Sequence, residues 1–328
     1  MMSKPRVLLT GANGFVGRQV LARLPDTVEI HCVSRGSRAA GESVTWHAVN
    51  LLDPAACAEL ISSVRPTHLV HLAWNVVHGK FWATPDNLQW RDAGIALVHA
   101  FGQAGGKRLL ISGTGAEYAS SDASPLDESG SSAEAETLYG RMKNALRIEA
   151  RTIAEEFGIS YAWARIFNVY GAGEDRGRLV PSIIGAILRN EAAKCSSGRQ
   201  VRDFMDVRDL GAALAALTLS DVQGPINLGS GQQEKIAEVA ETIGRLMGRP
   251  DLIALGALPD RPGDPLVQVP GLARMRDELG YASQIGIEQG LRDAIGWWAG
   301  LADENGSPGS ERNRSEKLDL AGCNHDHR

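Results

Sequence analysis

Short apolar runs alternate with helix-length segments along the first half of the chain. The runs that predict buried strands are residues 6–10, 28–33, 68–73 and 108–112. Residues 14–24 are patterned as a helix that Pro25 ends. Asp53-Pro54 predicts the start of another, since aspartate caps helices and proline suits the first helical position. Strands that alternate with helices predict an α/β fold, a doubly wound parallel sheet of the Rossmann type.

A longer helix is predicted over residues 131–157. Ser131 and Glu134 stand at capping-box spacing near its start, and Gly158 follows its end. The apolar face that we expect for it consists of Leu138, Met142, Ala145, Ile148 and Ile153.

The second half of the chain begins with a predicted strand at 160–167, and its pattern becomes less regular beyond Tyr170. A strand and turn at 224–231 and a short amphipathic helix at 236–247 are also expected. From these patterns we predict a dinucleotide-binding domain at 1–170, rejoined by about 201–228, a smaller mixed substrate-binding lobe at 171–200 and 229–302, and a disordered tail at 303–328.

Composition restricts the classes of partner. The chain has 328 residues, 43% of them hydrophobic, and no apolar run approaches the ~20 residues that a membrane helix needs. A net charge of -5 disfavours nucleic acid and anionic lipid as partners. The four cysteines show no metal-ligand spacing, and the first strand begins too early for a signal peptide. We therefore expect a soluble cytoplasmic protein that binds small molecules and no metal.

A glycine-rich turn follows the first predicted strand. Glycines at 11, 14 and 17 let the backbone turn tightly and approach a pyrophosphate at a helix N-terminus. A purely structural turn is the alternative, which the flanking strand and helix disfavour. The residues that we expect to contact a dinucleotide here are Gly11, Asn13, Gly14, Phe15, Val16 and Gly17, with Leu72 and Ala73 at the end of the third strand.

The end of the second strand bears on the choice of cofactor. An acidic residue there would bind the ribose 2′-hydroxyl of NAD, but the chain has Ser34-Arg35 and then Arg38. Guanidinium groups suit a 2′-phosphate, so NADP(H) is favoured and NAD(H) stays possible; a solvated loop with two arginines is the alternative. Asn50-Leu51 could hold the adenine edge, or Asn50 could belong to a turn ahead of Asp53.

Tyr139 and Lys143 are the candidate catalytic pair. They stand four residues apart, which places them on one face of a helix. We expect the Lys143 ammonium to lower the pKa of the Tyr139 phenol and ready it for proton transfer near neutral pH. Taken singly, each is more often an ordinary helix residue, and only the combination with the glycine-rich turn points to hydride chemistry.

Together these residues resemble the extended short-chain dehydrogenase/reductase family, which contains epimerases, dehydratases and 4-ketoreductases of nucleotide sugars. The resemblance runs from Arg6 to about Trp298. It rests on Thr-Gly-Ala-Asn-Gly-Phe-Val-Gly at 10–17, His-Leu-Ala at 71–73, Ile-Ser-Gly-Thr at 111–114, Tyr-Gly-Arg-Met-Lys at 139–143, Arg-Ile-Phe-Asn-Val-Tyr-Gly at 165–171, Arg-Asp-Phe-Met-Asp-Val-Arg-Asp-Leu at 202–210 and Arg-Pro-Gly-Asp at 261–264.

The resemblance implies roles for matching positions. Tyr139 would donate or accept the proton, Lys143 would activate it and bind the nicotinamide ribose, and Thr114 would hydrogen-bond the substrate oxygen. Substrate contacts are expected from Asn168, from Arg202 and Arg261 on a diphosphate, and from Trp74 and Asn75, which follow a strand where an open sheet binds ligands. Surface ion pairs are the alternative for the two arginines. The family also implies a homodimer that pairs through the long helix.

One missing sequence feature restricts the possible reactions. Related dehydratases carry an Asp-Glu pair after the threonine, where this chain has Gly115-Ala116, so dehydration is disfavoured. The first hypothesis is an NAD(P)H-dependent reductase of a nucleotide-linked 4-keto-6-deoxyhexose. A nucleotide-sugar 4-epimerase with retained NAD is the alternative, and a non-catalytic cofactor sensor is the alternative from another class.

Overall fold

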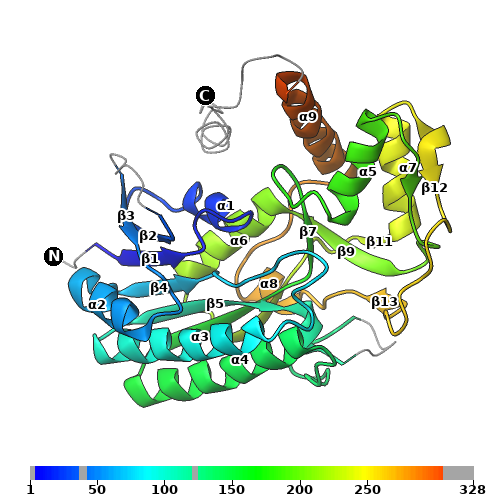
Figure 1. The fold of residues 1–328 in the computed structure, drawn as a ribbon. Helices are drawn as coiled ribbons and strands as arrows, with labels where there is room; N and C mark the ends of the chain where they lie inside the picture. Colours follow the sequence, from blue (N-terminus) through cyan, green and yellow to red (C-terminus); the bar gives the residue numbers. More distant parts are fainter. Residues whose placement is uncertain (1–3, 37–42, 120–124, 306–328) are drawn as a thin grey trace.

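A seven-stranded parallel sheet forms the centre of the larger part of the molecule (Figure 1). The computed structural model describes residues 4–36, 43–119 and 125–305. The strands, in spatial order, are β10 (Gly224–Leu228), β6 (Ser160–Ile166), β5 (Arg108–Thr114), β4 (His68–His71), β1 (Arg6–Thr10), β2 (Glu29–Ser34) and β3 (Val44–Ala48). All neighbouring pairs are parallel. The predicted doubly wound sheet is confirmed.

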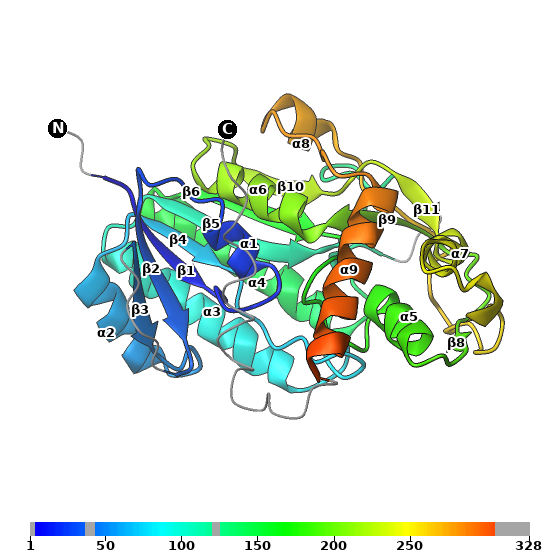
Figure 2. The same ribbon diagram turned by 90° about the horizontal axis from the view of Figure 1, so that it is seen from above.

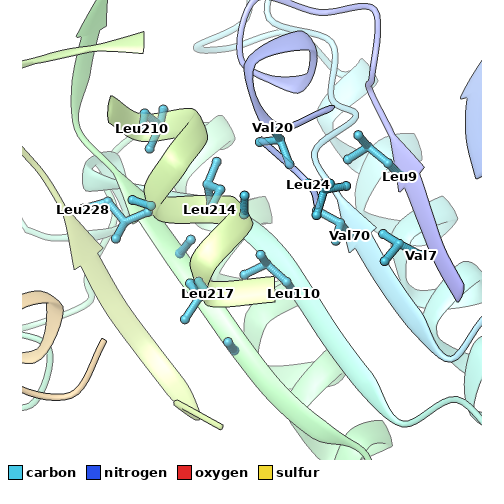
Figure 3. Packing of buried hydrophobic residues seen from close by; sticks show 14 of the residues in the cluster. Val7, Leu9, Val20, Leu24, Val70, Leu110, Leu210, Leu214, Leu217 and Leu228 are labelled. Atoms are coloured by element: carbon cyan, nitrogen blue, oxygen red, sulfur yellow. The ribbon is translucent and has the colours of Figure 1, made fainter. Parts of the chain in front are cut away.

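Helices cover both faces of this sheet (Figures 1 and 2). One face carries α2 (Pro54–Val64), α3 (Asp86–Gln103) and α4 (Leu138–Phe157), and the other carries α1 (Gly17–Leu21) and α6 (Val207–Thr218). Side chains alternate between the faces, so Val7 and Leu9 pack with α1 and α6 (Figure 3) whereas Leu8 packs with the opposite layer. Burial on both faces explains the short, continuous apolar runs of the sequence.

A smaller lobe follows β6 in the chain. Its mixed sheet contains β7 (Asn168–Tyr170), β9 (Val201–Asp206), β11 (Gln233–Lys235) and β13 (Val267–Gln268), with β11 antiparallel and β7 and β13 parallel to β9. Three helices share a separate core with it: α5 (Leu179–Leu188), α7 (Ile236–Leu246) and α9 (Ile287–Asn305). The remaining short elements are β8 (Ala193–Lys194), β12 (Ile253–Ala254), α8 (Ala273–Asp277) and two 3-10 helices, η1 (Gly115–Glu117) and η2 (Pro250–Leu252).

The chain crosses between the two parts more than once. After β9 it returns to the larger sheet through α6 and β10, inside the segment 201–228 that the sequence suggested would rejoin it. The exact domain boundaries stay a prediction. Helix α9 continues to Asn305, and residues 306–328 lie outside the described part of the chain. Within the described ranges, no helix has the length and hydropathy that crossing a bilayer requires.

The long helix begins later than the sequence predicted. Helix α4 starts at Leu138, and Thr137 caps it by accepting a hydrogen bond from the Gly140 amide at 3.1 Å. Ser131 instead accepts from the Asp127 amide at 2.9 Å, so the predicted capping box of Ser131 and Glu134 is wrong. Gly140 fixes this start, because a Cβ there would lie 2.2 Å from the carbonyl oxygen of Ala116.

The predicted apolar face of the same helix is also partly wrong. Ile148 is 46% exposed, whereas the buried face contains Tyr139, Lys143 and Leu146. Polar groups on the buried side broke the hydrophobic periodicity that the prediction used. Helix α1 is likewise shorter than the expected 14–24, because residues 11–16 form the tight turn ahead of it.

Candidate active site

The turn after β1 is built so closely that side chains cannot replace its glycines. Gly11 has φ +74°, and a Cβ there would lie 2.9 Å from the Ala73 amide nitrogen. A Cβ at Gly17 would lie 2.0 Å from the Gly11 carbonyl oxygen, while the Gly14 amide donates to that oxygen at 2.9 Å. The tight turn presents its exposed residues, Asn13 and Gly14, at the start of α1, where backbone amides can meet a phosphate-bearing ligand, and the residues fit a dinucleotide.

The neighbouring strand end supports this turn. The Thr10 hydroxyl lies 2.8 Å from Nδ1 of His71 and accepts from the Ala73 amide at 3.3 Å. These bonds join the carboxyl ends of β1 and β4, where an open parallel sheet binds its ligand. Of the expected contacts, Asn13 and Gly14 are exposed at the turn, and Phe15, Val16, Leu72 and Ala73 are half-buried beside it.

The adenosine side is less defined. Arg35 is exposed directly after β2, and Ser34 is buried with its hydroxyl donating to the Gly36 carbonyl. The predicted contact Arg38 lies outside the described residues. Asn50 accepts a hydrogen bond from the Leu52 amide at 3.2 Å and so belongs to the turn ahead of Asp53, while Leu51 packs against the core.

Thr114, Tyr139 and Lys143 come together at the carboxyl end of β5. Thr114 is the last residue of β5, and the other two lie in the first two turns of α4. The Thr114 side chain lies close enough to the Tyr139 phenol to lower its pKa. The ammonium of Lys143 donates to the Ser112 carbonyl at 2.9 Å and lies 4.1 Å from the ring centroid of Trp74.

The expected effect of Lys143 on Tyr139 is wrong for this structure. Burial raises the pKa of Tyr139 to about 12, which outweighs the lowering by the Thr114 hydrogen bond. Burial also lowers the pKa of Lys143 to about 7, against the charge of Glu117, which raises it. The Lys143 ammonium contacts the Ser112 carbonyl and the Trp74 ring. The removal of the Tyr139 phenol from water is therefore the largest effect on its pKa. Tyr139 therefore holds its proton firmly.

Three aromatic residues surround Tyr139, and we call them the aromatic wall. Trp74, Phe81 and Trp82 lie edge-on to its ring, with centroid distances of 6.2, 5.0 and 5.9 Å. Buried Asn87 fixes the wall, because its amide nitrogen donates to the Phe81 carbonyl at 2.7 Å and its oxygen accepts from the Trp74 indole at 2.8 Å. The ring of Tyr139 is thus packed on apolar surface.

The predicted substrate contacts are distributed over both parts of the molecule. Arg202 is 5% exposed on β9 and forms an ion pair with Asp264 at 2.8 Å. Arg261 is exposed on the loop before Asp264, and Asn168 is half-buried at the start of β7. Asn75 donates to the Asp86 carboxylate at 3.0 Å. The sequence motif 261–264 thus meets Arg202 directly through Asp264.

A comparison with protein-family models matches residues 7–229 to the NAD dependent epimerase/dehydratase family. The chain belongs to this family. It is an enzyme of the extended short-chain dehydrogenase/reductase type, as its sequence motifs implied. Among the residues that the structure describes, no cluster of side chains suited to holding a metal ion is found.

Several relatives within the epimerase/dehydratase family are similar over most of the chain. UDP-glucose 4-epimerase of Azospirillum brasilense is 28% identical, and the match covers 95% of this chain and 98% of that protein. UDP-glucuronic acid decarboxylase 6 of Arabidopsis thaliana is 34% identical, but the match covers only 42% of this chain and 40% of that protein. The solved structure of MoeE5 with UDP-glucose and NAD is 26% identical, has a TM-score of 0.79 and covers 90% of this chain and 99% of its own.

The sequence did not single out every residue that this member of the family brings to the site. Glu117, Phe81, Trp82 and Arg178 were missed; the Arg178 guanidinium lies 5.5 Å from the Phe81 ring centroid and its charge lowers the pKa of Tyr139. Thr114 and Glu117 do stand at capping-box spacing, which could have flagged the glutamate. The other three depend on loops that meet only in the fold, and no local pattern marks them.

Proposed function

We propose that the protein is an NAD(P)H-dependent reductase of a keto group on a nucleotide-activated deoxysugar, of the 4-keto-6-deoxyhexose type. The observation that carries the proposal is the convergence of Thr114, Tyr139 and Lys143 beside the glycine-rich turn. A bound dihydronicotinamide supplies hydride. The phenol and the threonine hydroxyl would stabilise and protonate the alkoxide oxygen that forms.

The protonation state of Tyr139 favours the reductive direction. With a pKa of about 12 the phenol is an acid that keeps its proton at neutral pH. A reductase needs a proton donor at the start of its step, whereas a 4-epimerase must first remove a proton from a hydroxyl. The absence of an Asp-Glu pair after Thr114 supports the same choice over dehydration.

The aromatic wall supports a deoxygenated substrate. A hydroxyl group pressed against half-buried Trp82 would lose its water without gaining a hydrogen bond, which costs about 1–3 kcal/mol. A sugar carbon without a hydroxyl has no such cost. Arg202, Arg261 and Asn168 would hold the nucleotide diphosphate and sugar, with Arg202 exchanging its Asp264 partner for phosphate oxygens.

The cofactor is proposed to be NADP(H), with NAD(H) as an alternative that the NAD complex of MoeE5 supports. Exposed Arg35 would pair with a 2′-phosphate. Replacing it by aspartate, Arg35→Asp, should lower kcat/KM for NADPH at least about tenfold and leave NADH turnover nearly unchanged. Equal losses of kcat/KM with NADPH and NADH would show that Arg35 does not distinguish the two cofactors.

A 4-epimerase is the second candidate, because the Azospirillum relative of that name matches almost the whole chain. Such an enzyme keeps its NAD through purification and oxidises no cofactor in net turnover. A homodimer through α4, on which Ile148 is 46% exposed, is a further proposal. Elution of the purified protein at monomer size would reject it.

The test is turnover of a panel of nucleotide-linked 4-keto sugars, followed as NADPH or NADH oxidation with product analysis. Tyr139→Phe should lower kcat about 10²–10⁴-fold. The matched control is Tyr161→Phe, since Tyr161 is a buried tyrosine whose hydroxyl donates to the Arg147 carbonyl at 3.1 Å. Failure of the wild-type protein to oxidise either cofactor with any ketosugar would reject the proposal.

A further inference from the structure

Glu117 lies directly behind Thr114 in the short turn after β5. Its side chain is fully buried, and Oε1 accepts hydrogen bonds from the Thr114 amide and from the Trp163 indole, both at 2.8 Å. In return, the Thr114 hydroxyl accepts from the Ala116 amide at 3.2 Å. Both the backbone and the side chain of Thr114 are therefore fixed by this one turn.

A buried cation pairs with the carboxylate. Arg165, 2% exposed on β6, donates from Nε to Oε2 of Glu117 at 2.9 Å, and its NH1 group donates to the Tyr118 hydroxyl at 2.8 Å. The Arg147 guanidinium adds a second positive charge 3.8 Å from Oε2. A carboxylate with these partners is held in one position.

Gly113 of β5 has no side chain, which lets the Glu117 carboxylate approach the strand. A Cβ at Gly113 would lie 2.5 Å from Oε1 of Glu117 and 2.1 Å from the Trp163 indole nitrogen. Any other residue at 113 would push Glu117 away from β5. The close approach of the carboxylate to the residue before Thr114 is thus built into the backbone.

We propose that Glu117 is a positioning residue, which holds Thr114 so that its hydroxyl meets the phenol of Tyr139. The inference rests on the proposed function for the meaning of that contact. Glu117 itself touches neither Tyr139 nor Lys143 by any hydrogen bond found among the described residues. It acts through the amide of Thr114 and through its charge.

The charge of Glu117 acts on both catalytic groups in the same direction. It raises the pKa of Tyr139, adding to the larger effect of burial, and it raises the pKa of Lys143 against burial. Loss of the charge would lower both values. Reduction needs the phenol and the ammonium protonated, so the alkaline limb of the pH profile would move to lower pH.

The first test is Glu117→Gln, which keeps an oxygen for the Thr114 amide but removes the charge. We expect the alkaline limb to move to lower pH, while kcat for ketosugar reduction below the limb, KM and cofactor Kd should change less than about threefold. The matched control is Asp209→Asn on α6, another buried carboxylate, which accepts from the Tyr281 hydroxyl at 3.0 Å and the Ile285 amide at 2.8 Å. The control should leave the limb unmoved.

A second variant separates position from charge and covers a failure of Glu117→Gln to fold. Glu117→Asp keeps the charge but withdraws the oxygen from the Thr114 amide, so kcat should fall while the alkaline limb stays in place. An unchanged kcat in Glu117→Asp would overturn the positioning role.

One readout does not depend on turnover. The ¹³Cε resonance of Lys143, identified by its loss in Lys143→Arg, reports the titration of the ammonium in the purified protein. Glu117→Gln should move this titration to lower pH, and no movement would overturn the electrostatic part of the proposal. If the wild-type protein reduces no ketosugar, the proposed function fails, whereas this titration still tests Glu117.

Discussion

Two buried glutamates, one in each part of the molecule, differ in the partners that surround their carboxyl groups. Glu117 follows β5, is fully buried and is met by Arg165, the Trp163 indole and the Thr114 amide. Glu174 follows β7 and is 9% exposed, and its Oε2 meets no hydrogen-bond partner among the residues that the structure describes. Burial raises the pKa of Glu174 to about 8, and the Arg178 charge and the Gly171 amide only partly oppose it.

The difference shows what holds a buried carboxylate in place. A cation and several donors fix the Glu117 carboxylate, which can then position a neighbour; where they are not supplied, as at Glu174, the group takes up a proton. The region behind Thr114 is therefore expected to be rigid. The turn after β7 is expected to lose stability as pH rises.

The largest effect should come from breaking the Glu117 pair. Arg165→Met leaves the carboxylate buried without its cation and should lower the free energy of unfolding by about 3–5 kcal/mol, measured by urea denaturation. The control Arg245→Met removes an ion pair with Glu288 in which both side chains are about half exposed, and its effect should be close to the experimental error. Equal losses in the two variants would contradict the account.

Glu174→Gln should have the opposite sign. The folded-state pKa of Glu174 lies above its ordinary value of 4.5, so the wild-type protein loses stability as pH rises from about 4.5 to about 8. The glutamine variant should be more stable than wild type at pH 8 by about 2–4 kcal/mol and nearly equal at pH 5. A difference that is the same at both pH values would mean that Glu174 is charged in the fold.

The pH dependence of ketosugar reduction should depend on Glu117 and not on Glu174. The pKa of Lys143 is about 7, and the ammonium is the active form, so kcat/KM should fall about tenfold per pH unit above that value. Glu174→Gln should leave this limb in place, since Glu174 is not among the groups whose charge shifts the pKa of Lys143. A shift of the alkaline limb in Glu174→Gln would show that the two regions are coupled.

Asp203 offers an intermediate case with a smaller effect. It is 1% exposed on β9 and accepts from the backbone amides of Ser230 and Gly231, both at 2.7 Å, but burial still raises its pKa. Asp203→Asn loses one of these two bonds and should cost about 1 kcal/mol, measured as for Arg165→Met. A loss as large as that of Arg165→Met would show that backbone donors alone can hold a buried charge.

The parts of the fold that local patterns encode were predicted well. The strands and the glycine-rich turn depend on apolar runs and on spacing within a few residues, and β1 has the bounds that the sequence predicted. Thr114, Tyr139 and Lys143 were found because motifs mark them. The start of α4 was missed because Ser131 bonds to Asp127 and a closer cap, Thr137, serves the helix.

The missed site residues depend on contacts distant in sequence. The partner of Glu117, Arg165, lies 48 residues later in the chain on β6. The pKa of Tyr139 was predicted in the wrong direction, because the aromatic wall that buries it comes from the loop before α3. Burial is a property of the whole fold, and spacing in the sequence does not report it.

Hydride transfer to the sugar is the central claim, and deuterium labelling tests it most directly. The protein would be given a nucleotide-linked 4-keto-6-deoxyhexose with NADPH carrying deuterium at C4, in each of the two stereochemical forms in turn. The account predicts that one form transfers one deuterium to the product carbon for each NADP⁺ produced, as read by mass spectrometry. A product of altered configuration that contains no deuterium, with no cofactor consumed, would contradict it.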